Sequence, residues 1–215
     1  MKSLRIFGHG ARIGMLALGL ISLAPAQDWV PLFNGKDLSG WEQKNGLAKY
    51  EAKDGCIVGS SVSNSPNSFL CTKKNYGDFE LEFEVMCDKA LNSGVQIRSE
   101  STPEYQKGRV HGYQVEIAVG GFSGGIYDEA RRGKFLNTNS ATAEIKALLK
   151  ENEWNKYRVL CQGDRIQAWV NGVQVTDLRD SMTQTGFIGL QVHGVGKRSD
   201  ALHVQWRNLR LRELK

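Results

Sequence analysis

The chain has 215 residues, of which 40% are hydrophobic and 24% charged, and its formal net charge is +5. This length and composition are ordinary for one globular domain with a sizeable core. After position 26, lysine and arginine occur at most as isolated pairs, so the charge pattern gives no support to nucleic-acid binding.

The first 26 residues have the layout of a secretory signal peptide. Lys2, Arg5 and Arg12 precede the apolar run "IGMLALGLISLA", and "APA" follows immediately before Gln27. The run is too short for an ordinary membrane span, although a retained N-terminal anchor is the alternative. We therefore expect export to the periplasm or beyond, and one mature domain over 27–215 without a membrane span. Cleavage removes three cations and no acid, which lowers the net charge from +5 to +2.

Export to an oxidising compartment makes the four cysteines candidates for disulfides. Cys56 and Cys71 lie on successive strand-like segments and form one candidate pair, which leaves Cys87 and Cys161 as the other. Four free buried thiols are the alternative. No C-x-x-C occurs, so the spacing does not resemble a zinc site.

Hydrophobic and polar residues alternate with a period of two in most segments of the chain. This alternation is seen in "DFELEFEVMCD", "NSGVQIRSE", "HGYQVEIAV", "WNKYRVLCQGDRIQAWVNGVQVTDL", "GFIGLQVHG" and "LHVQWRNLRLREL". Asp54-Gly55, Gln162-Gly163-Asp164 and Asn171-Gly172 are hairpin turn signals. Only 140–153 has a helical pattern, and we expect a short loop helix there. These features predict an all-β fold, a two-sheet antiparallel jelly-roll sandwich.

The second faces of the predicted strands fall into two groups. One carries ordinary solvated residues, such as Glu80, Glu82 and Glu84. The other carries amides, titratable groups and glycines, which suit a polyhydroxylated ligand such as a sugar. Its members are Gln96 and Arg98, Gln114 and Glu116, Gly125 and Tyr127, and Gln191 and His193. If these four strands are neighbours, the second group forms one polar concave surface.

Each of these residues also has a structural interpretation. His193 alone is typical of a satisfied structural histidine, and Glu116 of a solvated strand carboxylate. Arg98 pairs with Glu116 across strands in this alternative. Tyr127 is then a packing residue, and the charged residues at 128–132 form an ordinary loop. A site is therefore favoured because such residues occur on the second faces of four predicted strands at once.

Seven motifs occur together in one order: "PLFNGKDLSGW", "NSGVQIRSE", "GYQVEI", "GGIYDEARRGKF", "EWNKYRV", "VNGVQV" and "GLQVHG". With them the chain resembles the 3-keto-disaccharide hydrolase domain family over nearly the whole mature length. The resemblance implies a concanavalin A-like jelly roll and action on glycosides already oxidised at C3. Many members read "GYEVQI" where this chain reads "GYQVEI", which moves the acid to position 116 on the same face.

A C3 ketone acidifies the hydrogen at C2, so that a base can remove it and the C1 substituent can leave by elimination. Addition of water then completes a net hydrolysis. The reaction needs a base, a stabiliser for the enolate oxygen and an acid for the leaving group. The spaced carboxylate pair of ordinary glycosidases is not required, and we identify no second acid on the predicted face beside Glu116.

The resemblance and the residues together suggest the following roles. His193 is the candidate base, with Glu116 as its alternative, and Arg98 stabilises the enolate. The expected substrate-binding residues are Gln96, Gln114, Tyr127, Gln191 and Arg131. A divalent metal ion held by His193, Glu116 and His111 is left open as a cofactor.

The expected partners are a carbohydrate substrate and an upstream sugar C3-oxidising enzyme, with no nucleic acid. A non-catalytic carbohydrate-binding module on the same fold is the alternative to an enzyme. A structural domain of the cell envelope is a third reading. A binding module requires an aromatic platform, whereas Tyr127 is the one aromatic residue expected on the polar surface, which favours the enzyme.

Overall fold

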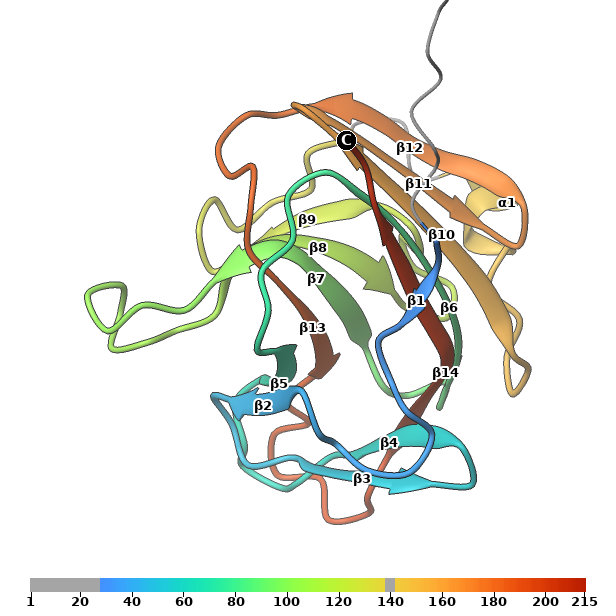
Figure 1. The fold of residues 1–215 in the computed structure, drawn as a ribbon. Helices are drawn as coiled ribbons and strands as arrows, with labels where there is room; N and C mark the ends of the chain where they lie inside the picture. The colour runs from blue at the N-terminus through green and yellow to red at the C-terminus, as the bar shows by residue number, and fades with distance from the viewer. Residues whose placement is uncertain (1–27, 138–141) are drawn as a thin grey trace, which may run out of the picture.

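A computed structural model describes residues 28–137 and 142–215, so the predicted signal peptide at 1–26 lies outside the described residues. The described chain forms two antiparallel sheets, drawn in Figure 1 as separate layers. The all-β sandwich predicted from alternation is therefore confirmed. No helix in the described part is long and apolar enough to cross a membrane.

The larger sheet has eight strands in the order β12-β11-β10-β6-β14-β4-β3, with β1 paired to β14. Their bounds are β1 Val30–Pro31, β3 Lys49–Lys53, β4 Cys56–Ser60, β6 Phe79–Cys87, β10 Asn155–Gln162, β11 Arg165–Val170, β12 Val173–Arg179 and β14 His203–Glu213. The three predicted turns join β3 to β4, β10 to β11 and β11 to β12. Asp54 and Asn171 adopt the positive φ that such two-residue turns require.

The smaller sheet has six strands in the order β2-β5-β13-β7-β8-β9. Their bounds are β2 Trp41–Lys44, β5 Ser68–Thr72, β7 Ser93–Glu100, β8 His111–Ile117, β9 Ile126–Glu129 and β13 Phe187–Val192. β13, β7, β8 and β9 are consecutive neighbours, so the four strands predicted to share a polar face do lie side by side.

The core lies between the two sheets and is filled by the inward members of each alternating strand. Val95, Val115 and Leu190 of the smaller sheet, and Leu81 and Trp206 of the larger, are fully buried. Phe83 stacks on Tyr157 with ring centroids 5.0 Å apart. Burial of this apolar surface is the main stabilising contribution to the fold.

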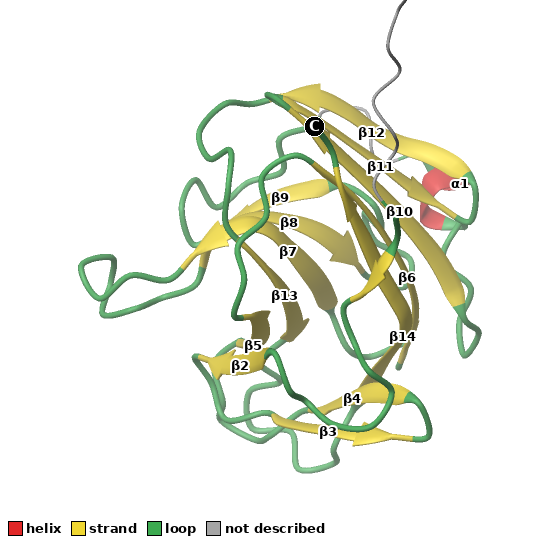
Figure 2. Cartoon of the chain, viewed as in Figure 1, coloured by secondary structure: helices red, strands yellow, loops and turns green. Residues whose placement is uncertain are grey.

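The helix is shorter than the pattern over 140–153 indicates. α1 covers Ala143–Lys146 and is the small red element of Figure 2. The Thr142 hydroxyl caps it by accepting from the Ile145 amide. After α1, the Asn155 side chain accepts a hydrogen bond from the Lys150 amide and donates one to the Lys150 carbonyl. These two bonds hold that segment in a turn instead of a helix.

All four cysteines are free and buried, so the expected Cys56–Cys71 and Cys87–Cys161 disulfides are not formed. Cys71 belongs to a small apolar cluster with Phe69, Val110 and Phe187. Cys87 and Cys161 belong to the main core instead. The alternative of four buried thiols is the one that this structure has.

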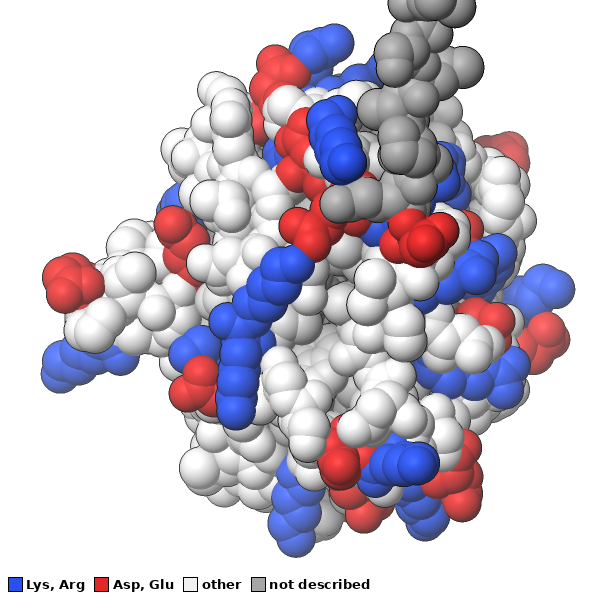
Figure 3. Space-filling model, in the orientation of Figure 1, with Lys and Arg blue, Asp and Glu red and all other residues white. Residues whose placement is uncertain are grey.

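The outer face of the larger sheet carries Glu80, Glu82 and Glu84, as their alternation predicts. Arginines of β10 and β14 cover these acids: Arg158 and Arg212 bind Glu80, and Arg207 binds Glu84. Both charge signs are also interspersed over the face seen in Figure 3. No broad basic area forms there, in keeping with the composition.

Candidate active site

The outer face of the smaller sheet contains a cavity of about 260 Å³. Gln114 and Glu116 of β8, Tyr127 and Glu129 of β9, and His193 after β13 contribute to its wall. Asn67, Asn92 and Phe135 from loops complete it. We call it the acid cavity, because two carboxyl groups and an imidazole converge on it.

Glu116 is held by two amides. Asn92 Nδ2 hydrogen-bonds to its Oε1, and Gln114 Nε2 donates to its Oε2 over 3.0 Å. Gln114 in turn accepts from Gln96 Nε2 at 2.8 Å, and Gln96 accepts from the Ser99 hydroxyl at 2.7 Å. Burial raises the pKa of Glu116, while the two amides act in the opposite direction. The network therefore fixes the position of the Glu116 carboxyl group.

Glu129 is a second acid on this face, so the expectation of a single acid there is wrong. It is only 8% exposed, and burial raises its pKa; Arg109, His193 and a hydrogen bond from Asn67 act against this effect. The signal was present in "IYDE": if β9 runs to its end, Glu129 lies two residues from Tyr127 and shares its face. The alternative interpretation of 128–132, an ordinary charged loop, hides this signal.

His193 is exposed at the mouth of the acid cavity. Its Nδ1 lies 2.8 Å from the Gly194 carbonyl. Since a carbonyl only accepts, Nδ1 carries the proton in this arrangement and Nε2 keeps a free lone pair. The Gly194 amide donates to Asn67 Oδ1 at 3.0 Å, so one loop asparagine positions both His193 and Glu129.

Tyr127 lies beside Phe135, with ring centroids 5.2 Å apart in an edge-to-face arrangement. Both rings border the acid cavity, and burial raises the pKa of the Tyr127 hydroxyl. Asn67, Asn92 and Phe135 were not among the predicted site residues. They come from loops, where strand alternation carries no information about which way a side chain points.

The side chains of Gln96 and Gln191 are on the same side of the sheet but lie below the surface, and both residues are fully buried. Gln96 supports Gln114, as described above. Gln191 stands between Phe69 of β5 and Gly94 of β7, and neither its Nε2 nor its Oε1 has a hydrogen-bond partner. An unpartnered buried amide is costly, so Gln191 is the polar group of this face most in need of a ligand or water.

Arg98 does not belong to the site, and its predicted catalytic role is wrong. A register shift interrupts β7 between Ile97 and Glu100, and Arg98 has a φ of 46° there. This bulge breaks the simple alternation that placed Arg98 beside Gln96. Its buried guanidinium instead binds the Gly77 and Gly163 carbonyls and Asp78 Oδ1, at 2.7 to 2.8 Å.

Arg131, predicted to bind substrate, is also elsewhere. Its Nε donates to Asp128 Oδ1 over 2.8 Å, and its guanidinium lies 4.8 Å from the centre of the Tyr113 ring. Asp128 of β9 and Tyr113 of β8 are buried, inward-facing residues. The arginine therefore closes an end of the sandwich instead of contributing to the acid cavity.

His111 does not join His193 and Glu116 in a metal site. Its ring stacks on Tyr105 at 3.8 Å, and its Nδ1 lies 2.9 Å from the Arg109 carbonyl. In the described ranges, no group of three or more His, Cys, Asp or Glu side chains is arranged to hold a metal ion. The residues present do not fit the three-ligand site that the sequence left open.

A family model described as the 3-keto-alpha-glucoside-1,2-lyase-like domain matches residues 28–212. The chain belongs to this family. The resemblance found in its motifs is thereby confirmed. A comparison with curated proteins finds no match.

Solved structures similar to this family member agree on the fold. A candidate glycosyl hydrolase from Parabacteroides distasonis has a TM-score of 0.64 at 22% identity, covering 87% of this chain and 94% of its own. A carbohydrate-binding module from Bacillus subtilis has a TM-score of 0.60 at 15% identity, with 81% and 96% covered. A β-glucanase from Bacillus licheniformis has a TM-score of 0.57 at 13% identity, with 90% and 100% covered. At these identities they show a shared jelly-roll fold of carbohydrate-related proteins.

The acid cavity of this 3-keto-alpha-glucoside-1,2-lyase-like chain brings proton-exchanging groups together. The charge of His193 lowers the pKa of both Glu116 and Glu129, against the effect of burial. One imidazole and two buried carboxyl groups therefore line the same cavity. This arrangement suits acid–base chemistry on a bound carbohydrate.

Proposed function

We propose that this protein is an exported enzyme that cleaves glycosides oxidised at C3, by elimination followed by hydration. The main support for this proposal is that His193, Glu116 and Glu129 line one cavity of about 260 Å³. The family supports the substrate class, and the "APA" signature after the apolar leader supports export. A separate enzyme that oxidises C3 must supply the substrate.

In the proposed reaction, His193 Nε2 takes the hydrogen from C2, which the neighbouring ketone makes acidic. The bond of Nδ1 to the Gly194 carbonyl holds the tautomer that leaves Nε2 free. Glu116 stabilises the imidazolium that forms, and the Asn92 and Gln114 amides keep its carboxylate in place. The Tyr127 hydroxyl donates to the developing enolate oxygen, the role first expected of Arg98.

Substrate binding rests on the polar groups of the same face. The unpartnered Gln191 amide is fully buried and does not line the cavity, so it offers its donor and acceptor to a bridging water. The Gln114 side chain accepts from Gln96 and donates to Glu116, and it also contributes to the cavity wall. Tyr127 and Phe135 offer ring edges to the apolar face of a pyranose.

The test offers the protein a 3-keto-glucoside and its parent glucoside, each with and without a chelator. Release of the aglycone only from the keto form supports the proposal. His193→Ala and Glu116→Gln should each lower kcat/KM by about 10²- to 10⁴-fold, the usual contribution of a positioned acid or base. His203→Ala, an exposed histidine of the other sheet, is the matched control and should leave turnover unchanged.

A carbohydrate-binding module is the second candidate, favoured by the fold shared with the Bacillus subtilis module. Calorimetry separates the two. Binding of the keto-glucoside without release of the aglycone would support the module and overturn the enzyme. Full turnover in both site variants would overturn the residue assignments.

A further inference from the structure

A second, larger cavity adjoins the acid cavity. Its volume is about 600 Å³, against about 260 Å³ for the first. Asn67 and Glu129 contribute to the walls of both. Glu129 therefore stands at the boundary between two adjoining spaces, one with His193 and the other without it.

The second cavity has an apolar floor and a cationic rim. Phe69, Val110 and Pro66 supply apolar atoms, whereas Lys107 and Arg109 are exposed on the loop at 101–110. Arg109 Nη1 donates to Gln106 Oε1 over 3.1 Å. Neither cation forms a close ion pair in the described ranges, although the charge of Arg109 also lowers the pKa of Glu129.

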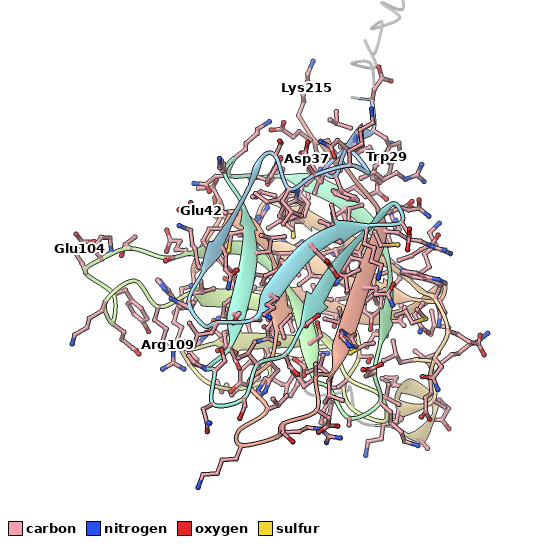
Figure 4. All side chains as sticks on the ribbon, turned by 90° about the horizontal axis from the view of Figure 1, so that it is seen from below. Trp29, Asp37, Glu42, Glu104, Arg109 and Lys215 are labelled. Atoms are coloured by element: carbon pink, nitrogen blue, oxygen red, sulfur yellow. The ribbon has the colours of Figure 1, made fainter. Side chains whose placement is uncertain are left out.

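The loop that carries these cations is anchored as a wall. The Asn45 side chain donates to the Gly108 carbonyl at 3.0 Å and accepts from the Val110 amide at 2.7 Å. The Tyr105 hydroxyl donates to the Ala130 carbonyl at 2.8 Å. Figure 4 shows Glu104 farther out along the loop than Arg109, which lies nearer the strands.

We propose that the glycosidic bond that is cleaved lies beside the Glu129 carboxyl group. The oxidised sugar then occupies the acid cavity, and the leaving group occupies the second cavity. This rests on the proposed function. His193 takes the C2 hydrogen, and the C–H electrons form the double bond between C1 and C2. The C1–O bond breaks, and its electrons stay on the leaving oxygen. The Glu129 carboxyl gives that oxygen its proton. The products are an unsaturated keto sugar and the free alcohol.

Glu129 suits the donor role better than Glu116 does. Both Glu116 oxygens accept hydrogen bonds from amides, an arrangement that favours a carboxylate. Glu129 has a single amide partner, Asn67, although Arg109 and His193 also lower its pKa. Of the two acids, only Glu129 lines both cavities, so its carboxyl group is the one placed beside a leaving oxygen at their boundary. The two acids thus stand in different environments, which separates their roles.

The second cavity also indicates the chemical class of the leaving group. Its apolar floor fits a ring, and Lys107 and Arg109 at the rim fit a negative charge on that ring. We therefore expect a leaving group that carries a carboxylate, either an aromatic acid or a uronic acid. Both share the ring and the charge, and the substrates below separate them.

The test compares 3-keto-α-glucosides with methyl, 4-nitrophenyl, 4-carboxyphenyl and glucuronate leaving groups. Glu129→Gln should lower kcat by about 10²- to 10⁴-fold on the methyl glycoside, whose alkoxide needs a proton. On 4-nitrophenyl, a good leaving group, the loss should be less than about tenfold. Loss to the same extent on both would overturn the proposal, because a purely structural role does not depend on the leaving group.

Lys107→Gln and Arg109→Gln should each raise KM for the two carboxylated substrates by about two- to fivefold, with kcat unchanged. KM for the methyl glycoside should stay constant. Lys53→Gln, on the β3 strand of the other sheet, is the matched control. An unchanged KM for both carboxylated substrates would overturn the charged-subsite assignment, and a change for only one identifies the acid class.

Binding of free 4-hydroxybenzoate, followed by ligand NMR, keeps the two proposals distinguishable. Binding that weakens in the Lys107 and Arg109 variants supports the second cavity even if no keto-glucoside is cleaved, an outcome that overturns the proposed reaction. If keto-glucosides are cleaved but 4-hydroxybenzoate does not bind, the reaction stands and the leaving-group cavity is overturned.

Discussion

The Gln114 side chain donates a hydrogen bond to Oε2 of Glu116 over 3.0 Å, two residues along the same face of β8. The amide of "GYQVEI" thus lies directly beside the buried carboxylate. A glycine on the next strand makes room for it: a Cβ at Gly94 would lie 2.5 Å from Gln114 atoms. The amide is therefore packed in position to hold Glu116.

Gln114→Met should move the acid limb of the pH profile of kcat/KM to higher pH. The amide lowers the pKa of Glu116 against the effect of burial, so its removal raises that pKa further. A hydrogen bond to a charged group is worth about 1.5 kcal/mol or more, which corresponds to about one pH unit. Gln167→Met, whose amide donates to Asp177 on the other sheet, is the control. An acid limb that stays in place would contradict the role of Gln114.

Arg98→Met should destabilise the protein and leave the activity of the folded protein intact. The substitution removes three hydrogen bonds of a fully buried guanidinium and leaves the Gly77 and Gly163 carbonyls without this donor. It should lower the free energy of unfolding by about 3 kcal/mol or more. Urea unfolding measures this loss. Arg165→Met removes an exposed pair with Asp177 and should cost less than about 1 kcal/mol. A specific loss of kcat in folded Arg98→Met would return Arg98 to the reaction.

Glu129→Gln should stabilise the protein progressively as the pH rises above about 4.5. Because burial raises the pKa of Glu129, its contribution to stability is present below the unfolded value and is lost as the pH rises through the folded value. Glutamine does not titrate, so the variant escapes this loss. Thermal unfolding from pH 4 to 9 measures the difference. Glu51→Gln, exposed on β3, should show no such trend.

The four cysteines should behave as protected thiols. Burial raises the pKa of Cys87 and Cys161 to about 12, and it also raises the pKa of Cys56 and Cys71. Thiolate is the reactive form, so alkylation of the native protein should be slow. Unfolding without reductant should release four reactive thiols, and reductant should leave Tm unchanged. A mass consistent with fewer than four alkylated thiols after unfolding would indicate a disulfide.

Much of the site could be predicted because β-strands repeat every two residues. Alternation places Gln114, Glu116, Tyr127, Gln191 and His193 on one face. The structure has the first four on that face of β8, β9 and β13, with His193 just after β13. The same reasoning was wrong for Arg98, because the register shift in β7 adds a residue that no periodicity reveals. It overlooked Glu129, because the strand β9 continues through residues that look like a charged loop.

The amino-acid sequence by itself determined the all-β class, the hairpin turns, the family and most of the polar face, since each depends on short-range pattern and local backbone preference. The tertiary structure alone decided which charges meet. It directed Arg98 to Asp78 and Arg131 to Asp128, kept His111 with Tyr105, and left the four thiols apart. It also brought Asn67 and Glu129 to the boundary of two cavities. These outcomes depend on bulges, strand order and loop anchoring between residues far apart in the chain, and no local pattern encodes them.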